Sequence, residues 1–243
     1  MEKNNTYNVN YSSSTITKKA ELGSIENDAC GNFGKFEIED FRGKKIFDIL
    51  INKEFNSILD IGAGEMKATE AFINKNKIVD ICDFDNSYYY KKKIIDKIDK
   101  INKKYIGDFN TLKFNKMYDA IWCSHVLEHS LNPNMFLKKI FSLLNEGGYL
   151  TIIVPPRKPF IVGGHVSIWN AGLLLYHLVL ANFDCSEAQI LQYDYNICVI
   201  VKKKTIILPK LNYDIGDLLL LNKFFPIDIK EDSFNGDIMN LNV

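Results

Sequence analysis

A short stretch of the chain, SILDIGAGEMKATEAF at residues 57–72, combines two glycines with two carboxylates. Residues typical of a β-strand lead into Asp60, Gly62 and Gly64 follow, and a helical pattern comes next. A strand–loop–helix of this kind presents backbone N–H groups to a ligand at the start of the helix. However, Met66 stands where a dinucleotide-binding G-x-G-x-x-G loop has its third glycine. The stretch therefore predicts a nucleotide-type ligand and disfavours a nicotinamide dinucleotide.

The two carboxylates indicate which nucleotide-type ligand the loop favours. Asp60 ends the strand and Glu65 lies inside the turn, so both would repel a pyrophosphate. A ligand that carries an ammonium and a sulfonium would be attracted instead, and it needs no phosphate cradle. S-adenosylmethionine has these charges. We expect it to be the cofactor, with S-adenosylhomocysteine as the product.

Acidic residues further along the chain are placed to complete such a site. Asp83 lies 19 residues after Gly64, at the end of the second predicted strand, where a carboxylate can accept both ribose hydroxyls. Asp85 is the alternative if that strand is two residues longer. After the next predicted helix, Asp108 is placed to accept from the adenine amino group and Phe109 to line the adenine ring.

Histidines and one arginine are candidates for the methyl acceptor's side of the site. A hydroxyl acceptor benefits from a general base, whereas an anionic phosphate-type oxygen needs donors that position it. His165, on a glycine-flexed loop after the fifth strand, and His125, after the fourth, are the candidate bases. Arg157 suits an anionic acceptor, and Trp169 is a candidate wall of the pocket. We expect His129 to be a helix residue with its hydrogen bonds satisfied.

Alternating strands and helices must position these residues. The pattern predicts an α/β, Rossmann-like, doubly wound sheet, mostly parallel and covered on both faces, with the ligand at the carboxyl ends of the first strands. Asn132–Pro133 and Asn170 are predicted helix starts, and Gly147 a helix end. The predicted strands are residues 57–62, 77–85, 118–124, 148–154, 189–193 and 196–203, the last two antiparallel. The predicted helices are residues 67–76, 88–105, 133–146 and 171–181.

The whole chain has 243 residues with 30 basic and 30 acidic side chains, so its formal net charge is zero. That balance argues against nucleic acid as a partner. The longest apolar run, residues 171–181, is too short to span a bilayer, so we expect a cytoplasmic protein. Its five cysteines include no C-x-x-C pair, and we expect no metal site.

Composition divides the chain into three parts. Residues 1–35 are polar and are expected to be a leader or a lid over the ligand. Residues 36–204 carry the alternating pattern of strands and helices and are expected to form the catalytic domain. Residues 205–243 break that alternation, and we expect this extension to pack on the core or to form a subunit contact.

Five segments within residues 36–203 resemble the successive motifs of class I S-adenosylmethionine-dependent methyltransferases. These segments are ILDIGAGEM, DFD, GDF, YDAIWCSHVLEHSLNP and LLNEGGYLTIIVPP. The resemblance implies a seven-stranded sheet whose last strand is antiparallel. It also implies that the cofactor is bound by Asp60, Gly62, Ala63, Gly64, Asp83, Phe84, Asp108, Phe109 and Ser124. Met66 is the departure from the family's glycine loop.

Residues 163–190 resemble small-molecule methyltransferases of bacterial surface-polysaccharide clusters, including those linked to methyl phosphoramidate decoration of capsules. This resemblance implies methyl transfer to an oxygen of a small anionic or nucleotide-linked metabolite. We expect the chain to act as a monomer or a homodimer. Two alternatives stay open. One is a binding module that holds S-adenosylmethionine without catalysis. The other is a methyltransferase of an unrelated small molecule, such as a quinone or lipid precursor.

Overall fold

The computed structural model describes residues 41–84, 86–87, 90, 98 and 100–243. Within these ranges a mixed sheet of eight strands forms the centre, in the order β3-β2-β1-β4-β5-β7-β6-β8. The strands are β1 (Ser57–Ile61), β2 (Ile78–Asp83), β3 (Lys103–Ile106), β4 (Tyr118–Ser124), β5 (Leu144–Val154), β6 (Gln189–Tyr193), β7 (Asn196–Lys202) and β8 (Asn240–Leu241).

Strands β3, β2, β1, β4 and β5 pair in parallel, whereas β7 pairs antiparallel with both β5 and β6. The α/β, Rossmann-like class expected from the sequence is therefore confirmed. The expected count of seven strands is wrong, because the short β8 adds an eighth strand at the edge beside β6. Only Ile190 and Leu191 pair with it.

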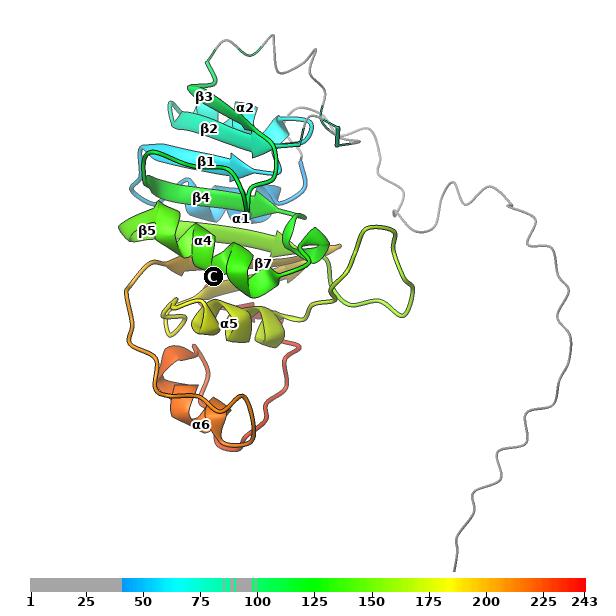
Figure 1. Ribbon diagram of the computed structural model, residues 1–243, viewed down its shortest axis with the longest axis vertical. Helices are drawn as coiled ribbons and strands as arrows, with labels where there is room; N and C mark the ends of the chain where they lie inside the picture. Colours follow the sequence, from blue (N-terminus) through cyan, green and yellow to red (C-terminus); the bar gives the residue numbers. More distant parts are fainter. Residues whose placement is uncertain (1–40, 85, 88–89, 91–97, 99) are drawn as a thin grey trace, which may run out of the picture. The chain divides into compact units, whose positions relative to one another are not determined.

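Helices cover both faces of the sheet (Figure 1). Helices α1 (Lys44–Leu50) and α2 (Lys67–Asn74) pack with one core cluster. Helices α4 (Pro133–Leu143) and α5 (Ala171–Leu180) pack with the other, which also receives the short α6 (Asp217–Leu221) and the 3-10 turn η2 (Asn222–Phe224). The central strands send alternate side chains into the two clusters, as Ile58 and Leu59 of β1 do.

The predicted helix starts are confirmed by side-chain caps. Asn132 accepts a hydrogen bond from the Met135 N–H at 3.3 Å, and Asn170 accepts one from the Leu173 N–H at 2.8 Å. Such caps satisfy N–H groups that have no partner within the helix. Strand β5 ends at Val154, immediately before the predicted break at the two prolines.

Two predicted boundaries are wrong. Helix α4 ends at Leu143 rather than at Gly147, which lies inside β5 with φ 80°. In the same region the register of β4 with β5 shifts between Tyr118 and Ala120, and a Cβ on Gly148 would lie 2.8 Å from the Asp119 carbonyl oxygen. In addition, residues 103–106 form β3 instead of the end of a helix. Most of the predicted helix at 88–105 lies outside the described residues.

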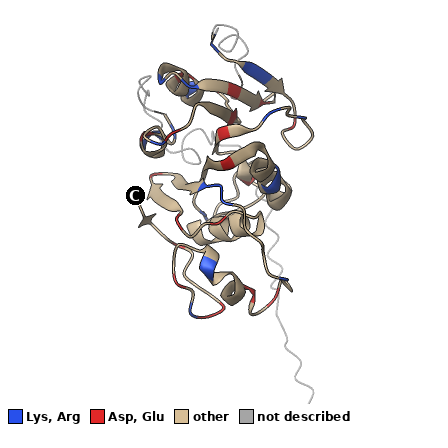
Figure 2. Cartoon of the chain, turned by 90° about the vertical axis from the view of Figure 1, so that its left-hand side faces the viewer, with Lys and Arg blue, Asp and Glu red and all other residues tan. Residues whose placement is uncertain are grey.

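Charges of both signs are distributed over strands, helices and loops of the described part (Figure 2). No helix in the described ranges is long and apolar enough to cross a membrane.

Candidate active site

The glycine loop between β1 and α2 has left-handed backbone at Gly62 (φ 74°) and Gly64 (φ 50°). The Gly62 N–H donates to the Cys82 carbonyl at 2.7 Å, which ties the loop to β2. A Cβ on Gly62 would lie 2.2 Å from Cγ2 of Val126. Only glycine fits this position, because both its backbone conformation and its neighbour exclude a side chain.

Met66 keeps the shape of the loop although it replaces a glycine. It has φ 66° and precedes the first residue of α2. Its side chain is fully buried in the core cluster that contains α1 and α2. Burial of that side chain offsets the cost of a left-handed conformation, which is about 1–2 kcal/mol for a residue with a Cβ.

The two carboxylates of the loop differ in environment. Asp60 is 2% exposed, and its Oδ2 accepts a hydrogen bond from the Thr69 hydroxyl at 2.6 Å. Burial raises the pKa of Asp60 to about 7; the Thr69 bond opposes this rise and the Asp83 charge adds to it. Glu65 is exposed and lies 3.7 Å from the Lys67 ammonium. Asp60, rather than Glu65, is therefore the carboxylate held inside the loop.

Asp83 is the last residue of β2 and lies against the glycine loop. Its Oδ2 accepts from the Gly64 N–H at 2.6 Å and its Oδ1 from the Phe84 N–H at 2.7 Å. Burial raises the pKa of Asp83, and these hydrogen bonds oppose the rise. The Phe84 side chain is 48% exposed next to it. The alternative ribose ligand, Asp85, lies outside the described residues.

The loop after β3 is held in place by a lysine that sequence reasoning did not single out. Lys139 of α4 donates to the carbonyl oxygens of Phe109, Asn110 and Leu112. Asp108 itself accepts from the Asn110 N–H at 2.8 Å. Phe109, expected to line the adenine ring, is only 4% exposed. Its ring packs at 4.8 Å from that of Phe136, so it supports the loop from the core side.

The segment after β4 carries the acceptor-side residues directly onto the glycine loop. Ser124 ends β4, and the next residue, His125, has φ 55°. Val126 then contacts Gly62. His125 Nε2 lies 2.9 Å from Asn196 Oδ1, and its Nδ1 lies 3.4 Å from Oε1 of Glu128. His125 is therefore positioned between β7 and the short 3-10 turn η1 (Leu127–His129).

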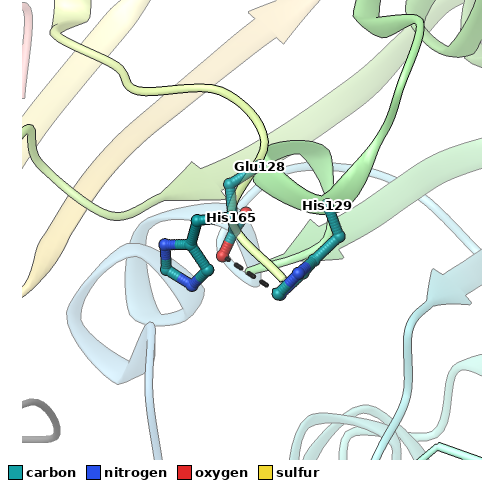
Figure 3. Close-up of side chains that lie close together, drawn as sticks. All are labelled: Glu128, His129 and His165. Atoms are coloured by element: carbon teal, nitrogen blue, oxygen red, sulfur yellow. Dashed lines mark ion pairs between the residues drawn. The ribbon is translucent and has the colours of Figure 1, made fainter. Parts of the chain in front are cut away.

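His165 joins the same group from a loop 40 positions further along the chain (Figure 3). Its ring lies 4.9 Å from that of His129, edge to face. Burial lowers the pKa of His165, and the nearby His129 and His125 add to the lowering while Glu128 opposes it. A neutral imidazole at neutral pH is the form that can accept a proton or bind a metal.

Glu128 is the residue of this group that the sequence analysis missed. Its side chain is fully buried, next to both candidate bases in the fold. A signal was present, because His125 and Glu128 are three positions apart and His129 follows at once. His129 is expected to be a helix residue with its hydrogen bonds satisfied, but only one of its two ring nitrogens has a hydrogen-bond partner among the described residues. Its Nδ1 bonds the Gly164 carbonyl at 2.8 Å, while its Nε2 lies 3.9 Å from Glu128 Oε1.

The two residues predicted to bind the acceptor, Arg157 and Trp169, are both engaged in contacts within the protein. The Arg157 guanidinium pairs with Asp237 of the C-terminal extension at 2.7 Å. Trp169 is 1% exposed and packs at 5.1 Å from the ring of His177. Lys158, next to Arg157, lies with its ammonium 4.2 Å from the centre of the Tyr195 ring. Lys158, unlike Arg157, lines the same narrow hollow as His165.

A narrow hollow of about 30 Å³ adjoins the histidines, and its lining includes His165, Lys158, Phe160, Ile161 and Tyr195. A wider hollow of about 640 Å³ lies where β1, β4 and β5 begin, around Asn56, Asp119 and Gly147. None of the predicted site residues lines the wider hollow. The carboxyl ends of the strands thus carry the candidate chemistry, as the topology of a doubly wound sheet requires.

The charge of the glycine-loop side fits S-adenosylmethionine. Asp60 lies one residue before the end of β1, and Asp83 ends the neighbouring β2. The pKa of each carboxyl is raised, and the Asp83 charge contributes to the rise at Asp60. A ligand with an ammonium and a sulfonium would relieve this repulsion, and a pyrophosphate would increase it. The left-handed glycines leave room for close approach of the ligand.

Comparison with known proteins agrees with the geometry. A family model described as "Methyltransferase domain" matches residues 37–183, which is more than half of the chain. No curated protein matches the sequence. The resemblance to class I methyltransferases expected from the motifs is thereby confirmed at the level of the family.

Solved structures of low sequence identity share the fold. A 1,6-didemethyltoxoflavin-N1-methyltransferase of Burkholderia thailandensis, solved with S-adenosylhomocysteine bound, has a TM-score of 0.54 at 15% identity over 66% of this chain and 76% of that one. An S-adenosylmethionine-dependent methyltransferase of Archaeoglobus fulgidus has a TM-score of 0.52 at 15% identity over 66% and 92%.

An O-methyltransferase family protein from Burkholderia thailandensis has a TM-score of 0.53 at 11% identity. The match covers 67% of this chain but only 56% of that protein, so this chain spans about half of its length. The family model, the eight-stranded sheet and the paired carboxylates agree: the chain belongs to the methyltransferase domain family, and its cofactor is S-adenosylmethionine.

Proposed function

We propose that this chain transfers a methyl group from S-adenosylmethionine to an oxygen of a small metabolite. The observation that carries the proposal is the contact of Val126 with Gly62. It sets the segment that bears His125 and Glu128 against the loop expected to hold the methionine end of the cofactor. When bound, S-adenosylmethionine supplies a methyl group on a sulfonium, which is already an activated leaving group.

The protein's part is to hold the acceptor oxygen in line with that methyl group. Orientation of this kind can contribute on the order of 7–11 kcal/mol to lowering the barrier. Asp60 and the glycine loop would hold the methionine end, Asp83 the ribose, and Asp108 the adenine. Ala63 in the glycine loop, Phe84 after Asp83 and Ser124 at the end of β4 would complete the cofactor site. Phe109 acts through the loop rather than by direct stacking.

A hydroxyl acceptor would give its proton to a histidine. His165 is the better placed of the two candidates, because it lines the narrow hollow and burial keeps its pKa low. Both nitrogens of His125 already face polar groups, Asn196 and Glu128. We therefore assign proton acceptance first to His165 and second to His125.

For the acceptor class, we propose an anionic or nucleotide-linked metabolite of bacterial surface-saccharide biosynthesis, the phosphoramidate modification among them. The resemblance of residues 163–190 to methyltransferases of such clusters supports this class. Lys158 at the narrow hollow supports the negative charge of the acceptor. Arg157 would contribute only if its pair with Asp237 opened. A monomer or homodimer in the cytoplasm is the form in which we expect it to act.

The exposed side chains of the loop after β5 favour a second candidate acceptor. Phe160 is 76% exposed, Ile161 92% and Ile168 62%. All three line the narrow hollow. Apolar groups at the mouth of a site suit an acceptor with an apolar portion, such as a quinone or lipid precursor.

The first test is calorimetric titration of the whole chain with S-adenosylhomocysteine, with NAD as the control ligand. We expect micromolar binding of S-adenosylhomocysteine and none of NAD. Candidate acceptors are then screened for formation of S-adenosylhomocysteine, with saccharide phosphates and nucleotide-linked sugars in one set and quinone precursors in the other. Binding without turnover on either set would favour a non-catalytic module, and absence of binding by folded protein would refute the cofactor site.

Two variants separate the halves of the site. Asp83→Ala should weaken S-adenosylhomocysteine binding by at least about 100-fold, because two charge-assisted hydrogen bonds of about 1.5–3 kcal/mol each are lost. Unchanged affinity would move the ribose contact to Asp85. His165→Ala should keep that affinity and lower turnover by about 10²–10⁴-fold if it is the base. If His165→Ala keeps full turnover, the base role is wrong.

A further inference from the structure

The carboxylate of Glu128 is an unusual group for a protein interior. Its side chain is fully buried, and neither Oε1 nor Oε2 accepts a hydrogen bond from any described residue. Burying a charge without such partners costs several kcal/mol unless a cation compensates it. The fold nevertheless fixes the backbone of this residue, because the N–H groups of Val166 and Ser167 donate to its carbonyl oxygen at 2.8 and 3.3 Å.

His129 directs its second ring nitrogen toward this carboxylate. The Gly164 carbonyl, 2.8 Å from Nδ1, can only accept a hydrogen bond, so Nδ1 carries a proton. In the neutral ring the lone pair is then on Nε2, which lies 3.9 Å from Glu128 Oε1. In that form two hydrogen-bond acceptors face each other. A histidine whose other ring nitrogen donates to a backbone carbonyl is the usual arrangement of a metal ligand.

His165 closes the group on the third side. One nitrogen or oxygen from each of Glu128, His129 and His165 lies within 4.8 Å of the others. Figure 3 shows the Glu128 carboxylate between the two imidazoles. The backbone at the loop is fixed by the His165 N–H, which donates to the Val162 carbonyl at 3.1 Å. This group departs from the expectation of no metal site, which rests on the absence of a C-x-x-C pair.

We propose that Glu128, His129 and His165 bind a divalent transition-metal ion, with zinc as the best match. Two imidazoles and one carboxylate are a typical ligand set for zinc in sites that leave a position open. Ligand atoms around a tetrahedral zinc are about 3.3 Å apart. Binding of the ion would require His129 and His165, whose side chains are both at least partly exposed, to move closer to Glu128 than the present spacing. His165 also lines the narrow hollow, so an open position would be reached from the acceptor side.

His125 offers the competing explanation for the buried charge. Its Nδ1 lies 3.4 Å from the same Oε1, while its Nε2 is bonded to Asn196. A doubly protonated His125 would neutralise Glu128 without any metal. That arrangement leaves unexplained why Nε2 of His129 also faces the carboxylate. The two explanations differ in one measurable property, which is metal binding.

The inference goes beyond the proposed function, because metal binding is measured without methyl donor or acceptor. It also changes one assignment: a metal-bound His165 nitrogen cannot accept the acceptor's proton, which would leave that role to His125. Failure of methyl transfer would leave the metal result standing. Failure of metal binding would leave the cofactor titration standing.

The experiment uses the whole chain without a histidine tag, freed of metal by a chelator. It is titrated with ZnCl₂ by calorimetry and with CoCl₂ by visible absorption. We expect one equivalent of each ion and a cobalt d–d spectrum of nitrogen and oxygen ligands. Zinc should also raise the melting temperature. No binding at millimolar zinc, or a sulfur-to-cobalt charge-transfer band, would overturn the proposal.

Variants assign the ligands. Glu128→Gln and His165→Ala should each weaken zinc binding by at least about tenfold and lose the melting-temperature shift. His177→Leu is the matched control, because it removes a histidine that packs on Trp169 away from the cluster, and it should bind zinc like the wild type. If Glu128→Gln fails to fold, His165→Ala still tests the ligand set. The His165 side chain is partly exposed, so we expect this variant to fold. Wild-type affinity in His165→Ala would overturn the ligand set.

Discussion

The two sides of the site each contain a buried carboxylate, and the two carboxylates are treated differently by the fold. On the cofactor side, Asp60 accepts a hydrogen bond from Thr69, nine positions away. On the acceptor side, neither oxygen of Glu128 accepts a hydrogen bond from the described protein. The nearest ring nitrogens come from His125 and His129, with His165 completing the group.

The difference shows how each side is prepared for its ligand. The glycine loop satisfies most of its polar groups internally, as Asp83 does with the Gly64 and Phe84 N–H groups. Its shape is therefore set before any ligand arrives. The acceptor side instead leaves a buried acceptor unsatisfied, and a native protein seldom does so without a ligand, ion or water as the partner.

The largest expected effect comes from Asp60→Asn. Burial raises the pKa of Asp60 from 3.8 to about 7 in the folded chain. Between these values the unfolded chain is ionised while the folded carboxyl keeps its proton, so the wild type loses stability as pH rises. The loss is on the order of 4 kcal/mol by pH 8. Asp60→Asn should remove it, which chemical denaturation at pH 4, 6 and 8 measures.

Cofactor affinity is the second readout for Asp60. S-adenosylhomocysteine carries an ammonium, so its binding to the wild type should strengthen as pH rises toward 7 and then level off. Asp60→Asn should bind more weakly at pH 8, without this pH dependence. Glu128→Gln is the matched change on the other side and should leave cofactor affinity unchanged. If Asp60→Asn and Glu128→Gln changed the affinity for S-adenosylhomocysteine equally, the cofactor side and the acceptor side would not differ as proposed.

A smaller loss is expected from Gly62→Ala. The left-handed backbone costs an alanine about 1–2 kcal/mol, and the contact with Val126 adds about 1–3 kcal/mol of overpacking. We expect a decrease of about 3 kcal/mol in the free energy of unfolding, together with weaker cofactor binding. Gly163→Ala is the control, because nothing lies within 4 Å of its added Cβ. A similar loss in both variants would show that the loop's shape is not specifically constrained.

The smallest effect concerns the ion pair of Arg157 with Asp237. Both side chains are substantially exposed, at 62% and 47%, so either Arg157→Gln or Asp237→Asn should change stability by less than about 1 kcal/mol. Turnover on an anionic acceptor distinguishes the two variants. If Arg157 binds the acceptor, Arg157→Gln raises KM and Asp237→Asn does not. Identical KM values in both would remove Arg157 from the acceptor site.

The sequence by itself determined the features that depend on neighbouring residues. Asn132 and Asn170 as helix caps follow from their own side chains and the turn after them. The strand that contains Asp60, and the glycines after it, follow from the local pattern and from backbone conformations that only glycine adopts easily. A short strand such as β3 has too few residues for a periodic signal, and it was assigned to the preceding helix.

Tertiary structure alone decided which side chains meet and which are covered. Phe109 is predicted to line a ligand, yet packing against Phe136 buries it. Arg157 is predicted at an open site, yet a residue 80 positions away pairs with it. Glu128 acquires its importance only because the loop of His165 is hydrogen-bonded to its backbone. Burial and long-range contact are properties of the packed chain, and no local pattern contains them.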